Sequence, residues 1–162
     1  MITAIYPGSF DPITNGHLDI LKRASRIFDK VVVTVMENPR KKPMFSLEER
    51  LEMLKVTTAG IANVEVDCYR GLLINYVKEK QARVIIKGLR AITDFEVEFQ
   101  MALINRKLDQ DIETMFMMTS GQHSYLSSSI VKEVASYGGN VESLVPPCVY
   151  KKIVRMYKEG TL

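Results

Sequence analysis

The sequence predicts a single doubly wound α/β domain, with helices on both faces of a five-stranded parallel sheet. Two observations predict this class. Short apolar runs of strand length alternate along the whole chain with stretches of helical periodicity, an order that requires right-handed crossovers between parallel strands. The length of 162 residues suits one domain, and no repeat or linker-like stretch divides it. We therefore expect residues 1–162 to fold as one unit.

The first half of the chain alternates regularly. Strands are expected at residues 2–6, 30–36 and 64–69, and the second of these, KVVVTVM, has the unalternated apolar run of a buried parallel strand. Helices are expected at residues 16–28, in a segment after Ser46, and at residues 72–80. In the first of these helices Ile27 is expected on the apolar face. The spacing of Ser46 and Glu49 is that of a capping box and marks where the second helix begins.

The second half continues the same alternation. Strands are expected at residues 83–87 and 113–118. Thr93 and Glu96 have capping-box spacing and predict a helix that runs to about residue 108. Two final helices are expected at residues 127–137 and 149–157, separated by a glycine pair and a proline pair.

Composition excludes several classes of protein. A net charge of +3 is far from the concentrated basic face of a nucleic-acid binder, and no apolar run is long enough to cross a membrane. The two cysteines, Cys68 and Cys148, lie far apart in no metal-ligand spacing, and no secretory leader opens the chain. We expect a cytoplasmic protein with neither a nucleic acid nor a membrane as partner.

The candidate site lies beyond the carboxyl ends of the strands, where ligands bind in sheets of this class. The first loop leads into a helix N-terminus, whose unpaired amides can receive a phosphate. In this loop Gly8 permits close approach, Ser9 and Thr14 offer hydroxyls, and His17 lies in the first helical turn. A lone histidine is more often a solvated helix residue, but the glycine-rich turn beside His17 at the expected binding edge favours a phosphate site.

Basic and hydroxyl residues follow three further strands. A cluster that includes Lys41 follows the second strand, Lys87 to Arg90 follow the fourth, and the serines at 127–129 follow the fifth. Each group also has a plainer interpretation, as a solubilising cluster or as helix capping. Position at one edge of the sheet favours phosphate binding by the basic groups, in which Arg90 can bind two oxygens at once. For the serines, helix capping and a phosphate cradle stay equally open.

Five segments together resemble the phosphopantetheine adenylyltransferase family of the nucleotidylyltransferase superfamily. They are GSFDPITNGH, which contains the T-x-G-H element of the superfamily, NPRKKPMFSLEER, KGLRAITDFEVE, the step Asn105-Arg106 and SYLSSSIVKEV. The resemblance spans nearly the whole chain and implies a Rossmann-like nucleotidylyltransferase fold. It also implies transfer of the adenylyl group of ATP to 4′-phosphopantetheine, which gives dephospho-coenzyme A and pyrophosphate in coenzyme A biosynthesis.

The same resemblance implies roles for individual residues. The catalytic residues it implies are His17, Lys41 and Arg90. The residues implied to bind phosphopantetheine are Ser9, Lys41, Leu73 and Lys87. The residues implied to bind ATP are Ser9, Phe10, His17, Gly88, Leu89, Arg90, Glu98, His123, Ser124, Tyr125, Leu126, Ser127, Ser128 and Ser129.

At two of these positions the chain departs from the family pattern. Lys87 stands where arginine is usual, which keeps the charge but loses the planar fork, and His123 stands where another aromatic residue is usual. Asp94 is interpreted as a residue that favours the helix N-terminus and is given no role in the site.

The resemblance further implies Mg²⁺ bound mainly through the phosphates of ATP, a homohexamer, and coenzyme A as a feedback inhibitor. A cation held by substrate oxygens and water leaves little trace in a sequence, so no protein ligand is named. Two alternatives stay open. One is another small-molecule nucleotidylyltransferase, of the nicotinamide mononucleotide adenylyltransferase or cytidylyltransferase type, against which the KKPMF and KGLRA segments argue. The other is a non-catalytic ATP-binding module.

Overall fold

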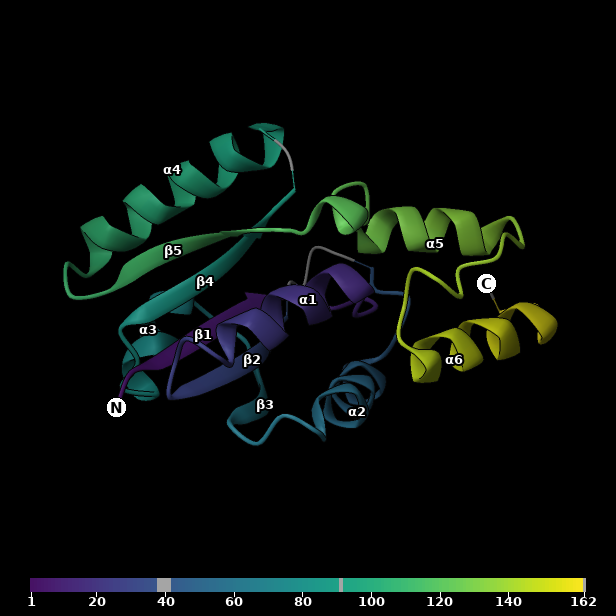
Figure 1. The fold of residues 1–162 in the computed structure, drawn as a ribbon, viewed down its shortest axis with the longest axis horizontal. Coiled ribbons are helices and arrows are strands. Elements are labelled where there is room, and N and C mark those ends of the chain that lie inside the picture. Colours follow the sequence, from purple (N-terminus) through teal and green to yellow (C-terminus); the bar gives the residue numbers. More distant parts are fainter. Residues whose placement is uncertain (38–41, 91, 162) are drawn as a thin grey trace.

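The computed structural model describes residues 1–37, 42–90 and 92–161. Its strands are β1 (Thr3–Gly8), β2 (Lys30–Met36), β3 (Val64–Tyr69), β4 (Val84–Leu89) and β5 (Glu113–Met118). They form one sheet in the order β3-β2-β1-β4-β5, and every neighbouring pair is parallel (Figure 1). The predicted five-stranded parallel sheet is confirmed. Its strand order reverses direction at β1, which lies between β2 and β4, and a topological switch point of this kind is where such sheets bind ligands.

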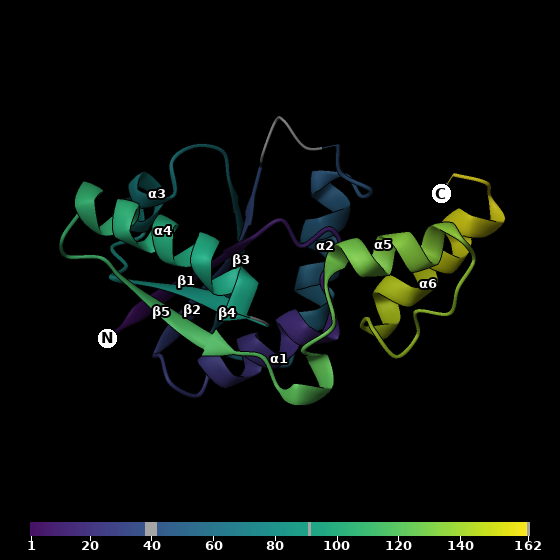
Figure 2. The same cartoon turned by 90° about the horizontal axis from the view of Figure 1, so that it is seen from above.

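Helices cover both faces of the sheet. They are α1 (Asn15–Ala24), α2 (Leu47–Thr58), α3 (Leu73–Glu79), α4 (Ile92–Leu108), α5 (Ser128–Ser136) and α6 (Pro147–Lys158), with a short 3₁₀ helix, η1, at Gly121–His123. Figure 2 shows α3 and α4 on one face of the sheet and α1 on the other.

The alternation of side chains along each strand supplies both faces with apolar residues. Tyr6 and Val33 belong to the larger core cluster, which includes residues of α1 and α2. Ile5 and Val32, their chain neighbours, belong to a second cluster with residues of α3. The interior of β2 is buried on both sides, as its unbroken apolar run predicts.

The last two helices, α5 and α6, lie together beyond the carboxyl ends of the strands (Figure 1). Val131 of α5 and Val149 and Ile153 of α6 are buried in the larger core cluster. The N-terminus of α5 is therefore held at the edge of the sheet where the candidate site is expected.

Two sequence predictions about helix ends are wrong. Helix α1 ends at Ala24 rather than near residue 28, because the chain turns there through i→i−3 hydrogen bonds, and the Ile27 side chain is 64% exposed rather than packed in the core. Helix α4 begins at Ile92, so Thr93 lies inside the helix and is not its N-cap. The Ser46 capping box is confirmed: the Glu49 N–H donates to Ser46 Oγ, and the Ser46 N–H donates to Glu49 Oε2.

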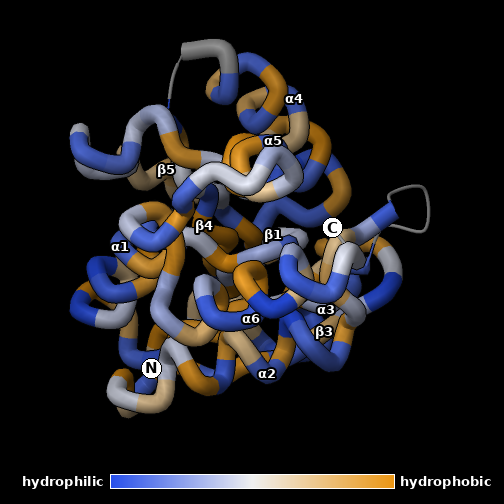
Figure 3. Tube along the Cα trace, turned by 90° about the vertical axis from the view of Figure 1, so that its right-hand side faces the viewer, coloured by the Kyte–Doolittle hydropathy of each residue, from blue (hydrophilic) through white to orange (hydrophobic). Residues whose placement is uncertain are grey.

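Apolar side chains remain exposed on α4 and on the edge strand β5. Those of α4 are Phe95, Val97, Phe99, Met101, Leu103, Ile104 and Leu108, and those of β5 are Met115 and Met118. Figure 3 shows apolar residues on α4, which lies at the periphery of the molecule. None of the helices in the described part of the chain is long and apolar enough to cross a membrane.

Candidate active site

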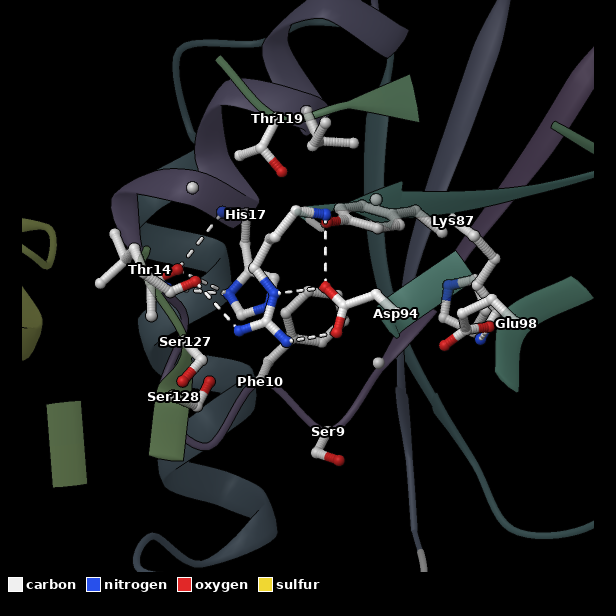
Figure 4. Close-up of a pocket in the computed structure, with 18 of the residues that line it drawn as sticks. Ser9, Phe10, Thr14, His17, Lys87, Asp94, Glu98, Thr119, Ser127 and Ser128 are labelled. Carbon is white, nitrogen blue, oxygen red and sulfur yellow. Dashed lines mark hydrogen bonds and ion pairs between the residues drawn. The ribbon is translucent and has the colours of Figure 1, made fainter. Parts of the chain in front are cut away.

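A cavity of about 650 Å³ opens at the carboxyl ends of β1 and β4, where the strand order predicts a ligand site (Figure 4). Its walls come from the loop after β1, the first turns of α1 and α4, the end of β4 and the segment that leads into α5. A second hollow of about 560 Å³ adjoins it, and both are lined by Ser9, Phe10, His17, Met36 and Ser128.

Most of the sequence-predicted site residues meet in the first cavity. They are Ser9, Phe10, His17, Leu73, Lys87, Gly88, Arg90, Glu98, Leu126, Ser127 and Ser128. Ser129 lines the second hollow instead. These residues lie far apart in the sequence, from Ser9 to Ser129, and the parallel sheet brings them to one edge.

Five predicted residues do not line the first cavity in the structure. Leu89 is buried in β4 with 4% of its surface exposed, and its carbonyl accepts from the Thr119 hydroxyl. His123 and Ser124 lie in and beside η1, and the Ser124 hydroxyl donates to the Gly121 carbonyl. The Tyr125 side chain is 61% exposed. Ser129 is the fifth, and Lys41 lies outside the described residues.

His17 is held by a capping box that the sequence did not reveal. The Thr14 N–H donates to His17 Nδ1 over 3.1 Å, and the His17 N–H donates to Thr14 Oγ1 over 3.4 Å. A backbone N–H can only donate, so Nδ1 must be the unprotonated acceptor of the ring. The proton of the neutral imidazole is therefore on Nε2, which leaves the ring one N–H donor in the cavity.

The surroundings keep this imidazole neutral. Burial, and to a lesser extent the nearby charge of Arg90, lower the pKa of His17 from 6.5 to about 4. Phe10 packs edge-on against the ring, with centroids 5.2 Å apart. At neutral pH the cavity thus contains a histidine that can donate one hydrogen bond but carries no charge.

Phe10 and Gly8 shape the floor of the cavity together. Phe10 has a positive φ of 45° and also packs edge-on against Tyr6, with centroids 5.5 Å apart. A Cβ at Gly8 would come within 3.0 Å of the Phe10 ring, so the close approach of the ring to the backbone needs glycine there. Burial and, to a lesser extent, Asp19 raise the pKa of Tyr6, which stays a neutral phenol.

Asp11 and Arg50 fix the first loop to its neighbours, and neither was among the predicted site residues. The Asp11 carboxylate accepts from the N–H groups of Met44 and Phe45 and pairs with Lys132 of α5 over 2.9 Å. Arg50 Nη1 donates to the Ser9 carbonyl over 3.0 Å. Three segments that are distant in sequence are thereby tied to the loop that carries His17.

Two ion pairs link the end of β4 to α4 across the cavity wall. Lys87 Nζ lies 3.1 Å from Glu98 Oε2, and Arg90 Nε lies 2.9 Å from Asp94 Oδ2 (Figure 4). Asp94 does lie in the first turn of α4, as interpreted, but it also has a role in the site, because its carboxylate binds Arg90 in the cavity wall. Its spacing of four residues from Arg90 was the signal in the sequence.

The serines at the start of α5 have different hydrogen-bond partners. Ser127 Oγ accepts from the Ile130 N–H and caps α5, and the Ser128 hydroxyl donates to the Pro12 carbonyl over 2.8 Å. Helix capping thus accounts for one of the three hydroxyls, as the plainer interpretation holds. Both side chains still line the first cavity at a helix N-terminus, where the helix dipole favours an anion.

The described residues contain no cluster of side chains that could form a metal-binding site. Within residues 1–37, 42–90 and 92–161, no three His, Cys, Asp or Glu side chains gather in a way that could hold a metal ion. The cavity does bring Lys87 and Arg90 together with a neutral histidine donor. This arrangement can bind phosphate groups and steady charge that develops on one of them.

The fold is that of a doubly wound α/β protein, and its cavity presents groups that can bind phosphates. Residues 5–134 match the model of the cytidylyltransferase-like family. Among solved structures, the Plasmodium falciparum nicotinic acid mononucleotide adenylyltransferase complexed with NaAD aligns with a TM-score of 0.71 at 14% identity, over 99% of this chain and 98% of that one. The lipopolysaccharide core biosynthesis protein from Thermoplasma volcanium GSS1 aligns with a TM-score of 0.53 at 24% identity, over 74% and 97%. At such low identity these two matches show the Rossmann-like fold alone.

Curated relatives narrow the class further. A phosphopantetheine adenylyltransferase of Alkaliphilus metalliredigens (strain QYMF) is 60% identical over 149 residues, which cover 92% of this chain and 95% of the relative. The enzyme of the same name from Clostridium botulinum (strain 657 / Type Ba4) is 59% identical over 157 residues, with 94% and 96% coverage. The chain belongs to the phosphopantetheine adenylyltransferase family of nucleotidyltransferases.

Proposed function

We propose that this chain transfers the adenylyl group of ATP to 4′-phosphopantetheine, producing dephospho-coenzyme A and pyrophosphate for coenzyme A biosynthesis. Relatives at about 60% identity over more than nine-tenths of the chain carry the name of that activity. The structural observation that carries the proposal is the fixed tautomer of His17. Its neutral ring, with one N–H donor in a cavity beside Arg90, suits a reaction in which charge develops on a phosphate.

The reaction needs no general base from the protein. A phosphate monoester has a second pKa near 6, so the phosphate of the acceptor is mostly dianionic at neutral pH and can attack the α-phosphorus of ATP directly. The new bond forms between the acceptor oxygen and the α-phosphorus, and the bond to the β-phosphate oxygen breaks, with its electrons leaving on pyrophosphate. Catalysis then consists of positioning and charge stabilisation.

The residues of the cavity divide this work. His17 donates from Nε2 to an oxygen of the α-phosphate, whose negative charge grows in the transition state. Arg90 and the N-terminus of α5 bind the departing pyrophosphate, and Lys87 binds the phosphate of the acceptor. Lys41 is proposed to act beside His17, although it lies outside the described residues.

Mg²⁺ is proposed as the cofactor. When bound to ATP it neutralises phosphate charge, and the absence of a carboxylate cage in the described residues fits an ion bound mainly through phosphate oxygens and water. We also propose a cytoplasmic homohexamer with coenzyme A as feedback inhibitor. The exposed apolar residues of α4 and β5 support assembly with further copies of the chain.

The deciding experiment measures pyrophosphate release with Mg²⁺ and ATP, with and without 4′-phosphopantetheine. Nicotinamide mononucleotide as acceptor and CTP as donor are the matched controls. Release that requires both ATP and phosphopantetheine is the expected result. Release with a control pair would overturn the substrate assignment, and no release from any pair despite ATP binding would overturn the enzyme assignment in favour of a nucleotide-binding module.

A further inference from the structure

The guanidinium of Arg90 is held at three of its donors. Nε and Nη2 donate to the two oxygens of Asp94, over 2.9 Å and 3.0 Å, and Nη1 donates to the Leu126 carbonyl over 3.3 Å. The two anchors come from different walls of the cavity, α4 and the segment before α5. Arginine has five N–H donors in a rigid plane, so one donor on each terminal nitrogen has no partner among the described residues.

We propose that Asp94 is a positioning residue, which holds Arg90 so that its two remaining N–H donors meet the polyphosphate of the nucleotide. This inference rests on the proposed function, since it names how one phosphate-binding residue of that same site is oriented. A planar guanidinium gripped along one edge cannot rotate, and its terminal nitrogens then present donors in a fixed direction. Without the grip, a long half-exposed side chain would have to be ordered anew by each ATP molecule that binds.

The Asp94 carboxylate could instead weaken ATP binding, because a negative charge near the phosphates would repel them and would offset the charge of Arg90. Two features favour orientation over repulsion. Asp94 uses both oxygens on Arg90, so each carboxylate oxygen already accepts from a guanidinium donor. The Arg90 N–H also donates to Asp94 Oδ2 over 3.3 Å, which joins the carboxylate to the backbone as well as to the side chain.

The test compares ATP binding by calorimetry in the presence of Mg²⁺, and kcat and KM for both substrates, in the wild type and Asp94→Asn. Asparagine keeps the size of the side chain but removes the charge and one acceptor oxygen. We expect ATP affinity and kcat/KM for ATP to fall by about tenfold, as for loss of one charge-assisted hydrogen bond, with KM for phosphopantetheine nearly unchanged. Unchanged ATP binding would overturn the proposal, and tighter binding would show instead that the Asp94 charge weakens phosphate binding.

A double-mutant cycle separates positioning from a merely structural role. If Asp94 acts through Arg90, Asp94→Asn should cause no further loss of ATP affinity in the Arg90→Ala background. A loss of the same size in both backgrounds would overturn the proposal. Asp94→Glu keeps the charge and should bind ATP more tightly than Asp94→Asn does, which preserves the test if the asparagine variant folds poorly; binding as weak as that of Asp94→Asn would count against the proposal.

Glu96→Gln is the matched control, because Glu96 lies on the same helix, is exposed and has no ion-pair partner among the described residues. It removes one negative charge without touching Arg90, so ATP binding should stay within about twofold of the wild type. An equal loss in both variants would show a general charge effect and overturn the proposal. A wild type that binds ATP without transferring it would refute the proposed function, yet the ATP-binding comparison would still test Asp94.

Discussion

At the scale of single residues, the chemistry of the site depends on which nitrogen of His17 is protonated. The Thr14 N–H makes Nδ1 an acceptor and so assigns the proton to Nε2. Burial and Arg90 keep the ring neutral at physiological pH. A neutral donor can stabilise developing charge on the α-phosphate without first binding the ground state as tightly as a cation would, and such differential stabilisation raises kcat.

Replacement of His17 by alanine tests this role. We expect His17→Ala to lower kcat by about 10²–10³-fold, the usual cost of removing one donor to a transition state, while the dissociation constant of ATP changes far less. Steady-state kinetics and calorimetry measure the two quantities. Lost ATP binding with an unchanged kcat at saturation would contradict the assignment.

The same ring should make stability depend on pH. The folded pKa of about 4 lies below the ordinary value of 6.5, so the unfolded chain takes up a proton before the folded one does. The contribution of His17 is therefore fully present above pH 6.5 and is lost as pH falls towards 4. We expect the free energy of unfolding to decline over this window by up to about 3 kcal/mol from His17, less for its partial exposure to the cavity.

Urea denaturation of the wild type and His17→Gln at a series of pH values measures this effect. Glutamine removes the titrating ring. The difference in free energy of unfolding between the two proteins should therefore narrow as pH falls from 6.5 to 4. A difference that stays constant across the window would mean that the folded pKa of His17 is not lowered.

At the scale of elements, Asp11 joins the first loop to the segment before α2 and to α5. Its carboxylate is 5% exposed and accepts from two backbone N–H groups and Lys132. We expect Asp11→Asn to reduce the free energy of unfolding by about 2–4 kcal/mol, because the amide cannot accept at both positions and leaves buried donors without a full partner. Chemical denaturation measures the change.

Asp111→Asn serves as the comparison for Asp11. Asp111 is exposed and its carboxylate has no partner among the described residues, so its replacement should change stability by less than about 0.5 kcal/mol. Equal effects of the two substitutions would refute the anchoring role of Asp11.

The alternation of strands and helices could be predicted from the sequence because each element has its own period and start signal. The run of β2 and the Ser46 capping box are local features, and both are confirmed. The end of α1 and the start of α4 could not be predicted, since tertiary contacts and turn bonds decide within a few residues where a helix stops. Loop position at the sheet edge was enough to place most of the cavity residues.

The partners of those residues were harder to predict than the residues themselves. A histidine at the third helical position can cap as glutamate does, but the usual capping-box pattern has Glu or Gln there, so the Thr14–His17 spacing alone does not indicate one. Asp94 could be interpreted as a helix-terminus acid or as a partner of Arg90, and the structure shows that it is both. Asp11 and Arg50 contact residues distant in sequence, for which a single chain offers no local signal.

At the scale of the whole molecule, the exposed apolar surface of α4 begins at the cavity, where Val97 lines the wall, and continues along the helix. Asp94 and Glu98, in its first turns, face the cavity, whereas Ile104 and Leu108 lie towards its far end. Exposed apolar side chains gathered on one helix and the adjacent edge strand are typical of a surface that another chain covers. For a chain whose family resemblance implies a homohexamer, we expect the covering chain to be a second copy.

Substitution of Ile104 tests this expectation. Its side chain is 51% exposed, so Ile104→Glu should leave the fold of the isolated chain intact but introduce a charge into an apolar contact between copies. We expect the variant to dissociate into smaller species, measured by light scattering after size exclusion, while its circular dichroism spectrum is retained. Ile27→Glu, at another exposed isoleucine just beyond α1, should leave the assembly unchanged. If the Ile104 variant keeps the assembly of the wild type, copies of the chain do not meet through this part of α4, and the apolar surface must be covered in another way.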